Sequence, residues 1–478
     1  MASRRDDYVE TALHSVPLAD VEQIASTPAR DREYVPRDGG YGWMCVFCVF
    51  LINSNTWGLD FAYGVFLDYF LTHNHYPGAT ALDYALIGGI SISMSLVITP
   101  LINTSSRKLG TRPTLLIGLV ALTASLVGAS FATEVWHLFL SQGVCFGWGV
   151  GFLYIGSSNI IPQWFSSKRS LANGLSASGA GFGGLVYSLA ASQMLETLGP
   201  AGTFRILAIC GFVGNFIAIV LINDQNARQR PNHSAFNYRL LARIEVWLVL
   251  GWGCLSELGY TVLLFSLPNY ASSIGLSARQ GSIVIALLNL SLFVGRPLLG
   301  HSSDMLGRIN MAVMTTGVCG TSCLLVWIFA KSFGVLCFFA ILAGLVCGTF
   351  WATVAPVVAE VSGLSEVPST LSIVLVLMVV PTTFAESIAL GLRRPTGNIY
   401  LDAQIFVGFM FIAASICTLF LRSWKINKMK HEAIEQRDHQ LERLGIVNRQ
   451  SADTINLENR CSKQFVELIH GLFALARV

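Results

Sequence analysis

Charge is scarce in this sequence. Asp, Glu, Lys and Arg make up only 12% of its 478 residues, half of the ~25% that is usual in soluble domains. A soluble chain of this length folds as two or three domains, whose surfaces need far more charge. The composition therefore excludes a soluble enzyme, a nucleic-acid-binding protein and a disordered scaffold. Lipid is the expected solvent.

Motifs for nucleotides and metals are lacking as well. The sequence has no Walker motif, which would indicate direct coupling to ATP, and no H-E-x-x-H or other metal-ligand spacing. Its 11 cysteines lie in apolar runs without the regular spacing of a disulfide framework. Residues 1–42 are polar and lack the apolar core of a secretory signal. We expect no metal, no cofactor and no catalytic residues.

Long apolar runs take the place of these features, and hydrophobic residues make up 53% of the chain. A membrane-spanning helix needs ~20 mostly apolar residues, whereas barrel strands have only ~10 residues of alternating polarity. The runs are of helical length, so we predict an all-α membrane protein with twelve transmembrane helices; eleven or thirteen is the alternative count. The predicted spans lie at 43–71, 82–103, 113–132, 136–157, 169–193, 203–222, 243–268, 281–300, 309–330, 333–355, 369–392 and 400–421.

The distribution of Lys and Arg predicts the orientation, because positive loops stay on the cytoplasmic side. Of the 31 Lys and Arg, 25 fall on the side of the N-terminus, five on the opposite side, and Arg296 within a span. Both termini are therefore predicted to be cytoplasmic. The plasma membrane is the expected location, with a vacuolar or other internal membrane as the alternative.

An internal repeat indicates a duplicated chain. Residues 100–110 read PLINTSSRKLG and residues 297–307 read PLLGHSSDMLG, which are identical at six of eleven positions with a constant offset of 197. Both copies follow a span on the same side, and such a parallel duplication of six-helix halves resembles the major facilitator superfamily. The predicted divisions are a cytoplasmic tail at 1–42, one half at 43–222, a cytoplasmic loop at 223–242, the other half at 243–421 and a cytoplasmic tail at 422–478.

The second copy resembles the loop motif of major facilitators. It reads G-R-P-x-x-G-x-x-x-D-x-x-G-R over residues 295–308. Asp304 and Arg308 can pair with each other or with the N-terminal end of a neighbouring helix, and the glycines permit a sharp turn. We predict a conformational latch, with an ordinary charged turn as the alternative. The latch residues expected in the two copies are Arg107, Gly110, Arg112, Asp304, Gly307 and Arg308.

The start of the first span resembles the [DE]-G-G-x-G-W signature of the monocarboxylate transporter family. Further matches are W-F-x-x-K-R-x-L-A-x-G-L-x-x-S-G at 164–179 and L-G-Y at 258–260, and the length and composition are most similar to fungal members. The resemblance implies the major facilitator fold and a transporter that works by alternating access. The signature residues in this sequence are Asp38, Gly39, Gly40, Gly42 and Trp43.

Arg296 is the first candidate for binding substrate. A charge within a span costs several kcal/mol unless it faces an aqueous cavity or a partner, and a guanidinium suits a carboxylate. The family resemblance implies the same role for this position; membership of the Asp304–Arg308 latch is the alternative. Asn289, Asn55 and Tyr154 are expected to complete the site, although a lone intramembrane Asn also commonly bonds a neighbouring helix.

Two charged positions of animal monocarboxylate carriers are absent from this sequence. The resemblance places Phe61 where those carriers have a Lys, and Leu292 where they have an Asp. Proton-coupled lactate transport of the animal kind is therefore not expected. Fungal members of the family include riboflavin carriers and proteins encoded beside secondary-metabolite genes, which fits a changed substrate. Three intramembrane acids are candidates for proton coupling, with a structural role as the alternative for each: Asp60, Glu257 and Glu386.

The prediction is a secondary-active transporter, not an enzyme, that moves a small organic anion or planar metabolite by alternating access. A monocarboxylate, a vitamin such as riboflavin and a secondary metabolite are the substrate classes, with proton co-transport as a further expectation. Its partners are the substrate and the lipid bilayer, with no nucleic acid. The alternatives are an exporter of a fungal secondary metabolite and a non-transporting nutrient sensor of the same fold.

Overall fold

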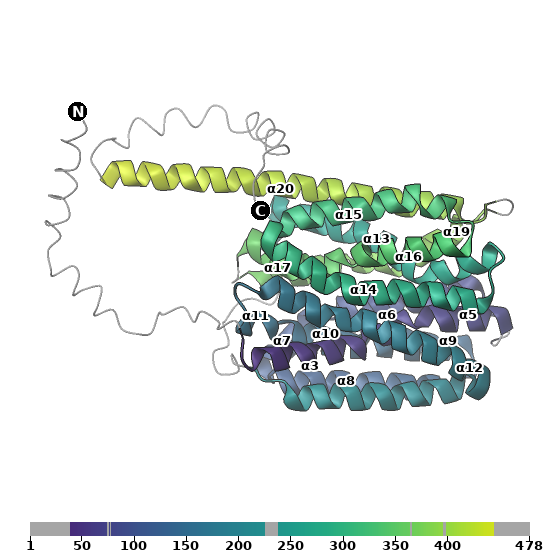
Figure 1. The fold of residues 1–478 in the computed structure, drawn as a ribbon. Coiled ribbons are helices and arrows are strands. Elements are labelled where there is room, and N and C mark those ends of the chain that lie inside the picture. Colours follow the sequence, from purple (N-terminus) through teal and green to yellow (C-terminus); the bar gives the residue numbers. More distant parts are fainter. Residues whose placement is uncertain are drawn as a thin grey trace. The chain divides into compact units, whose positions relative to one another are not determined.

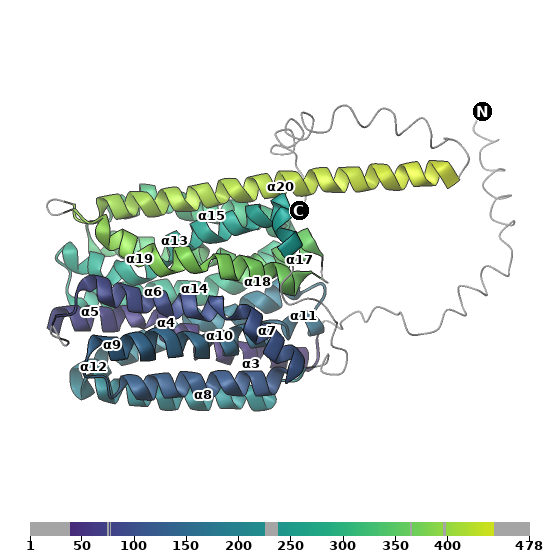
Figure 2. The same ribbon diagram turned by 180° about the vertical axis from the view of Figure 1, so that it is seen from behind.

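The computed structural model describes residues 39–73, 76, 78–224, 238–363, 366–394 and 398–443. All regular elements in this part of the chain are helices (Figures 1 and 2). Asp38 of the signature, most of both predicted tails and most of the central loop lie outside the described residues.

The helices fall into two sets along the chain, one before residue 222 and one after residue 237. The first set is α3 (Gly42–Ser54), α4 (Trp57–Phe61), α5 (Tyr63–His73), α6 (Ala81–Val97), α7 (Thr99–Lys108), α8 (Thr111–Ala129), α9 (Val135–Leu138), the π-helix η2 (Phe139–Cys145), α10 (Phe146–Ser158), α11 (Ile161–Trp164) and α12 (Arg169–Leu221).

The second set begins with a 3₁₀ turn and ends with the longest single helix of this set. It comprises η4 (Tyr238–Ala242), α13 (Ile244–Ser273), α14 (Ala278–Leu306), α15 (Arg308–Leu325), the 3₁₀ turn η5 (Trp327–Phe329), α16 (Phe333–Cys347), α17 (Thr349–Ser362), α18 (Val367–Leu377), α19 (Val379–Gly391) and α20 (Leu401–Arg443).

Twelve membrane crossings follow from these helices. The described residues hold ten continuous segments that are long and apolar enough to span, or eleven when α6 and α7, bent by 42°, count as one. One of the ten is α12, whose 53 residues include a non-helical Gly199 (φ 67°) followed by Pro200. At 1.5 Å per residue α12 would be about 80 Å long, more than twice the ~30 Å hydrocarbon core. It therefore crosses twice, with its turn at Gly199.

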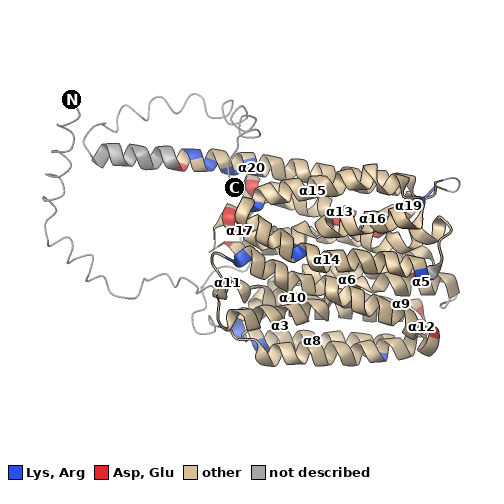
Figure 3. Ribbon diagram, viewed as in Figure 1, with Lys and Arg blue, Asp and Glu red and all other residues tan. Residues whose placement is uncertain are grey.

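The two ends of the bundle differ in charge. We call the end where α3 begins and where α7 joins α8 the tail end, and the end where α12 turns at Gly199 the hairpin end. Lys and Arg concentrate at the tail end in the described part of the chain (Figure 3). This distribution agrees with the sequence count, while the side of the membrane that each end faces stays a prediction.

Several spans are broken near their middle. The first span is interrupted at Asn55 and Thr56 and again at Ala62, which leaves α4 as a helix of five residues. Gly348 separates α16 from α17, and Met378 separates α18 from α19. Irregular backbone at membrane depth occurs where it is buried in protein or lines a cavity, so these breaks direct attention to the centre of the bundle.

The first half of α12 is the central packing element, because its glycines face two helices at once. A Cβ atom at Gly179 or Gly183 would meet the backbone of α3, and one at Gly174 or Gly181 would meet the backbone of α14. Small residues let membrane helices approach this closely. Through them α12 joins the first set of helices to the second.

Replacing Gly183 with alanine is expected to lower the melting temperature of the purified protein. The added Cβ would fall on the carbonyl oxygen of Ser54, and overpacking of this kind typically costs about 1–3 kcal/mol. The matched control is Gly334→Ala in α16, where nothing lies within 4 Å of the added carbon. That change should leave the melting temperature equal or slightly higher. Equal melting temperatures for the two variants would contradict this account of the α12 contact.

Candidate substrate-binding site

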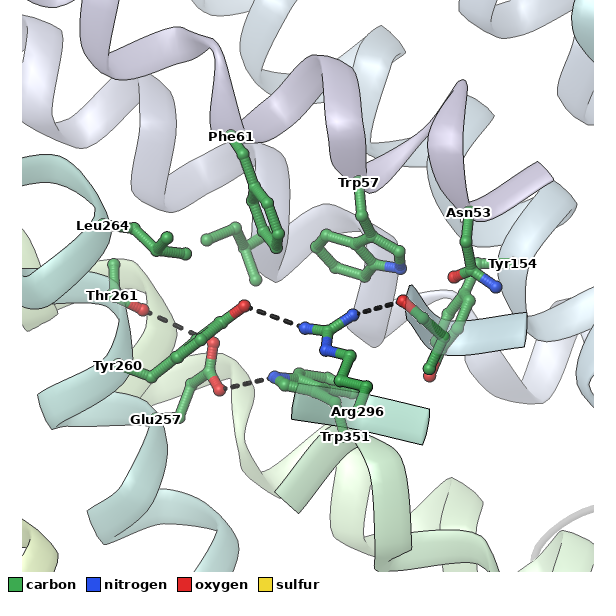
Figure 4. Close-up of a pocket in the computed structure, with 12 residues that line it drawn as sticks. Asn53, Trp57, Phe61, Tyr154, Glu257, Tyr260, Thr261, Leu264, Arg296 and Trp351 are labelled. Atoms are coloured by element: carbon green, nitrogen blue, oxygen red, sulfur yellow. Dashed lines mark hydrogen bonds between the residues drawn. The ribbon is translucent and has the colours of Figure 1, made fainter. Parts of the chain in front are cut away.

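A cavity lies at the centre of the bundle (Figure 4). Both sets of helices contribute to it, with α3, α4, α6, α10 and α12 on one side and α13, α14 and α17 on the other. The lining residues are Asn53, Trp57, Phe61, Ile92, Tyr154, Ala177, Glu257, Tyr260, Thr261, Leu264, Arg296 and Trp351.

Arg296 brings a buried positive charge into this cavity. Its side chain is only 4% exposed. The Nη1 atom donates to the carbonyl oxygen of Ala177 at 2.6 Å, and Nη2 donates to the Tyr260 hydroxyl at 3.0 Å. Nε is buried without a hydrogen-bond partner. Within the described residues no carboxylate lies within 4.0 Å of the guanidinium, so its charge has no direct counter-ion.

Glu257 places an acid in the same cavity. One carboxylate oxygen accepts from the indole N–H of Trp351 at 2.9 Å, and the other from the Thr261 hydroxyl at 3.4 Å (Figure 4). These two donors come from α17 and α13 and fix the orientation of the carboxyl group. The cavity therefore contains one cationic and one acidic group that do not form an ion pair with each other.

Aromatic rings from both sides form much of the remaining wall. The centroid of Trp57 lies 5.6 Å from Trp351 and 5.5 Å from Tyr154. Tyr154 lies 6.1 Å from Trp351, and Phe61 lies 6.1 Å from Tyr260. Rings at these separations offer faces and edges on which a flat, apolar group can pack.

Further cavities lie towards both ends of the bundle. The cavity on the tail side, of about 750 Å³, shares Asn53, Tyr154, Ala177 and Trp351 with the central one. The cavity on the hairpin side, of about 1310 Å³, begins at Pro268, one helical turn beyond Leu264 of the central cavity. A ligand at Arg296 would thus sit between two spaces that lead to opposite ends.

The predicted site residues divide into two groups. Arg296, Tyr154 and Glu257 line the central cavity together, but Asn55 and Asn289 do not. Asn55 donates to the carbonyl of Leu51 at 2.8 Å and accepts from Tyr187 at 2.5 Å, so it holds α3 against α12. Asn289 is fully buried against Gly184, in the contact between α14 and α12.

The other two predicted acids lie away from the centre. Glu386 of α19 is 1% exposed and accepts from Ser266 of α13 at 2.7 Å. Asp60 of α4 is 4% exposed and accepts from Ser91 of α6 at 2.7 Å. Each carboxylate therefore bonds a residue of a neighbouring helix and does not line the central cavity.

The predicted latch residues form contacts at the tail end. An Asp304 oxygen accepts from the backbone N–H of Leu171 at 3.0 Å, in the first turn of α12. Arg308 lies 3.7 Å from Asp304 and donates to Ser170 at 3.2 Å. Asp304 and Arg308 thereby tie the end of α14 and the start of α15 to the N-terminal end of α12, across the two sets of helices.

The first copy of the repeat makes different contacts. Gly110 and Gly307 both have φ of 101° at the same place in their copies, where a side chain would be strained. Arg112 donates to the carbonyl oxygen of Ile222 at 2.9 Å and so covers the C-terminal end of α12. Arg107 is exposed at the end of α7. The described signature residues Gly39 and Gly40 precede α3, and Gly42 and Trp43 pack on the Trp164–Phe165 segment.

Comparison with known families agrees with this arrangement. A family profile described as "Major Facilitator Superfamily" matches residues 43–319 and 249–441. The chain belongs to the major facilitator superfamily. As a major facilitator, it has the duplicated fold that the repeat at 100–110 and 297–307 predicts.

Individual relatives place this major facilitator in the monocarboxylate transporter-like group. "Probable transporter MCH2" of Saccharomyces cerevisiae is 33% identical over 81% of this chain and 84% of its own length. The "Fujikurins efflux protein" of Gibberella fujikuroi is 26% identical over 84% and 87%. "Monocarboxylate transporter 10" of Danio rerio is 24% identical over 78% and 77%. The relatives are named as transporters, so this chain is a membrane transporter and not an enzyme.

Several lining residues of this major facilitator were not predicted as site residues. Trp57, Tyr260 and Thr261 lie in the cavity. Tyr260 and Thr261 follow Glu257 at helical spacings of three and four, which places all three on one face of α13. That spacing is a signal in the sequence. No such spacing points to Trp57, because the direction of its side chain depends on the break in the helix before α4.

Proposed function

We propose that this transporter moves a carboxylate that carries a flat, apolar group. The observation that supports it is a buried Arg296 with no carboxylate of the described residues within 4.0 Å, in a cavity walled by aromatic rings. A guanidinium in low dielectric needs an anion to offset its desolvation, and its planar donors fit a carboxylate. The rings of Trp57, Tyr154 and Trp351 would pack on the flat part of the same molecule.

Alternating access accounts for the positions of the cavities. The bound anion would leave towards one end when the other end is closed, and the contacts of Asp304 and Arg308 would hold the tail end closed in one state. The proposal includes the two halves at 43–222 and 243–421, cytoplasmic termini and the plasma membrane. Antibodies should not bind an epitope tag at either terminus in intact cells, and should bind it once the cells are permeabilised.

A thermal-shift panel on the purified protein tests the substrate class. Pyruvate represents small carboxylates and benzoate planar carboxylates. Benzyl alcohol and riboflavin represent flat molecules without a carboxylate. We expect benzoate to raise the melting temperature most, pyruvate less and the two others not at all. Uptake of labelled pyruvate into vesicles containing the protein, inhibited by benzoate, would then show transport. Stabilisation by riboflavin or benzyl alcohol alone would contradict the proposal.

Proton coupling through Glu257 is the second part of the proposal. A proton on Glu257 would remove the negative charge that faces the bound anion, so anion binding should strengthen on acidification. The expected change is at least about tenfold, because two unit charges within ~10 Å at an effective dielectric of ~20 interact by more than about 1.4 kcal/mol. Glu257→Gln keeps an acceptor for the Trp351 indole and should bind benzoate equally well at all pH values.

The matched control for this prediction is Glu386→Gln, which removes a buried acid that contacts Ser266 outside the cavity. Benzoate binding to that variant should keep the pH dependence of the unmodified protein. Isothermal titration calorimetry at several pH values measures both variants. A pH dependence retained in Glu257→Gln and lost in Glu386→Gln would move the coupling role from one acid to the other.

Export of a secondary metabolite is the second candidate function, because one relative is named as an efflux protein. Vesicles that hold the protein in a single known orientation, loaded with substrate on one side only, separate import from export. A nutrient sensor of the same fold would bind the panel compounds without moving pyruvate.

A further inference from the structure

A second cavity surrounds Asp60 within the first set of helices. It is small and is bounded by α4, α5, α6, α8, η2, α10 and α12. Ser91 donates to one oxygen of Asp60, and the other oxygen, Oδ2, is buried without a hydrogen-bond partner. Most of the wall is apolar. Its apolar residues are Leu59, Phe66, Ile87, Leu126, Phe146, Phe204 and Leu207.

Gln142 faces the same cavity from η2. Its side chain is 7% exposed, and Nε2 is buried without a hydrogen-bond partner. A π-helix such as η2 is rare and often occurs at functional sites. The cavity therefore contains two polar side chains, Asp60 and Gln142, each with one polar atom that is buried without a hydrogen-bond partner. Native proteins pair nearly all such groups, so a site is the better explanation than a packing defect.

The charges around the cavity determine which ligand fits. No Lys, Arg or His is among its lining residues. Tyr63 is the other titratable lining residue, but its hydroxyl donates to the carbonyl of Tyr84 at 2.8 Å. Outside the cavity, Glu257 of α13 interacts electrostatically with Asp60. A hard metal cation takes about six oxygen ligands, more than Asp60, Ser91 and Gln142 provide. A proton needs only one carboxyl oxygen.

We infer that Asp60 is a second proton-binding group, apart from the substrate cavity, and that Ser91 and Gln142 are its positioning residues. The inference rests on the proposed transport function. It extends that function because α4 connects the two cavities: Trp57 and Phe61 face the substrate, while Asp60 faces the second cavity. α4 is separated from the helices before and after it by Thr56 and Ala62.

The exchange of the proton on Asp60 thereby acts on the substrate cavity through α4. Loss of the proton leaves a carboxylate in an apolar cavity, and its Oδ2 then recruits the Gln142 amide as a donor. That movement displaces α4 and with it the two aromatic rings that line the substrate cavity. Proton binding and substrate access are in this way linked without contact between proton and substrate.

Infrared difference spectroscopy on the full-length protein in lipid vesicles tests the proton site without any substrate. Spectra are compared between acidic and mildly alkaline buffer. We expect a protonated-carboxyl band that Asp60→Asn removes and that Ser91→Ala moves to higher frequency, because the carboxyl loses a hydrogen bond. Tyr63→Phe should leave the band unchanged, since that hydroxyl bonds elsewhere. A full set of carboxyl bands in Asp60→Asn would overturn the inference.

Two further measurements keep the test decisive. If Asp60→Asn does not fold, unchanged bands in both Ser91→Ala and Gln142→Leu overturn the inference. Hydrogen–deuterium exchange of residues 55–66, corrected for the intrinsic pH dependence, should change with pH in the unmodified protein and lose that change in Asp60→Asn. A pH response retained in that variant overturns the link to α4. Failure of the benzoate panel would contradict the proposed substrate and leave the infrared result standing.

Discussion

Replacing Arg296 with methionine is expected to abolish stabilisation by benzoate and to raise the melting temperature of the ligand-free protein. The first effect follows because truncating one partner of a buried charge pair costs about 2–5 kcal/mol, which is roughly 30-fold to several thousand-fold in affinity. The second follows because Arg296 is 4% exposed and has no carboxylate within 4.0 Å in the described part of the chain. An apolar side chain removes that desolvation cost.

The opposite signs of these two effects separate a binding role from a structural one. If Arg296 served only the latch, methionine would lower the melting temperature and leave the benzoate response in place. The lost contact to Ala177 leaves no orphaned carbonyl, because that oxygen lies within α12, where backbone carbonyls accept helix bonds. Thermal denaturation measures both effects: the shift that benzoate causes reports binding, and the melting temperature without benzoate reports stability.

Lysine at position 296 and methionine at position 308 are the matched controls. Arg296→Lys keeps the charge but loses the planar pair of donors, so benzoate should bind about tenfold more weakly than to the unmodified protein. Arg308→Met removes an arginine whose side chain is 20% exposed and contacts Asp304 and Ser170. It should keep the benzoate response. An equal loss of benzoate stabilisation in Arg296→Met, Arg296→Lys and Arg308→Met would argue against a specific role for Arg296.

The spans could be predicted from the sequence because hydropathy reports directly on the lipid-facing length. The predicted gap between 193 and 203 contains the turn at Gly199, which confirms two spans within α12. The predicted ends of the helices were less accurate than the predicted number of spans. The run at 281–300 belongs to a helix that continues to Leu306, because its last turns are polar and leave the apolar part of the bundle.

The binding face could be predicted only in part. Arg296 was identifiable because a charge in an apolar run is rare and expensive. Asn53 and Asn55 are only two residues apart, yet Asn53 lines the cavity and Asn55 bonds Tyr187. The side of the helix that faces the cavity depends on the break after Ser54 and on the position of α12. Neither is encoded in local hydropathy, and the same holds for Gln142, whose direction follows from a π-helix.

Replacing Asp304 with alanine is expected to open the tail end of the transporter. This carboxylate accepts from the backbone N–H of Leu171 and lies near Arg308, and it adds favourable charge at the N-terminal end of α12. Loss of a helix cap and its charge interaction costs about 1–3 kcal/mol. A coupling energy of that size shifts a two-state equilibrium roughly 5–150-fold.

The internal repeat supplies the control for this variant. Position 107 of the first copy corresponds to position 304 at the offset of 197, and it carries Arg107 instead of an acid. A positive charge cannot cap a helix N-terminus, so Arg107→Ala does not remove a cap of this kind and should have little effect on the opening. A cysteine introduced at Ser176, which lines the tail-side cavity and is 2% exposed, reports the opening by its alkylation rate, followed by mass spectrometry of its peptide. The rate should rise in Asp304→Ala and stay within about twofold in Arg107→Ala. Equal rates in both variants would mean that the two copies contribute alike and that the carboxylate of Asp304 is not what holds the tail end closed.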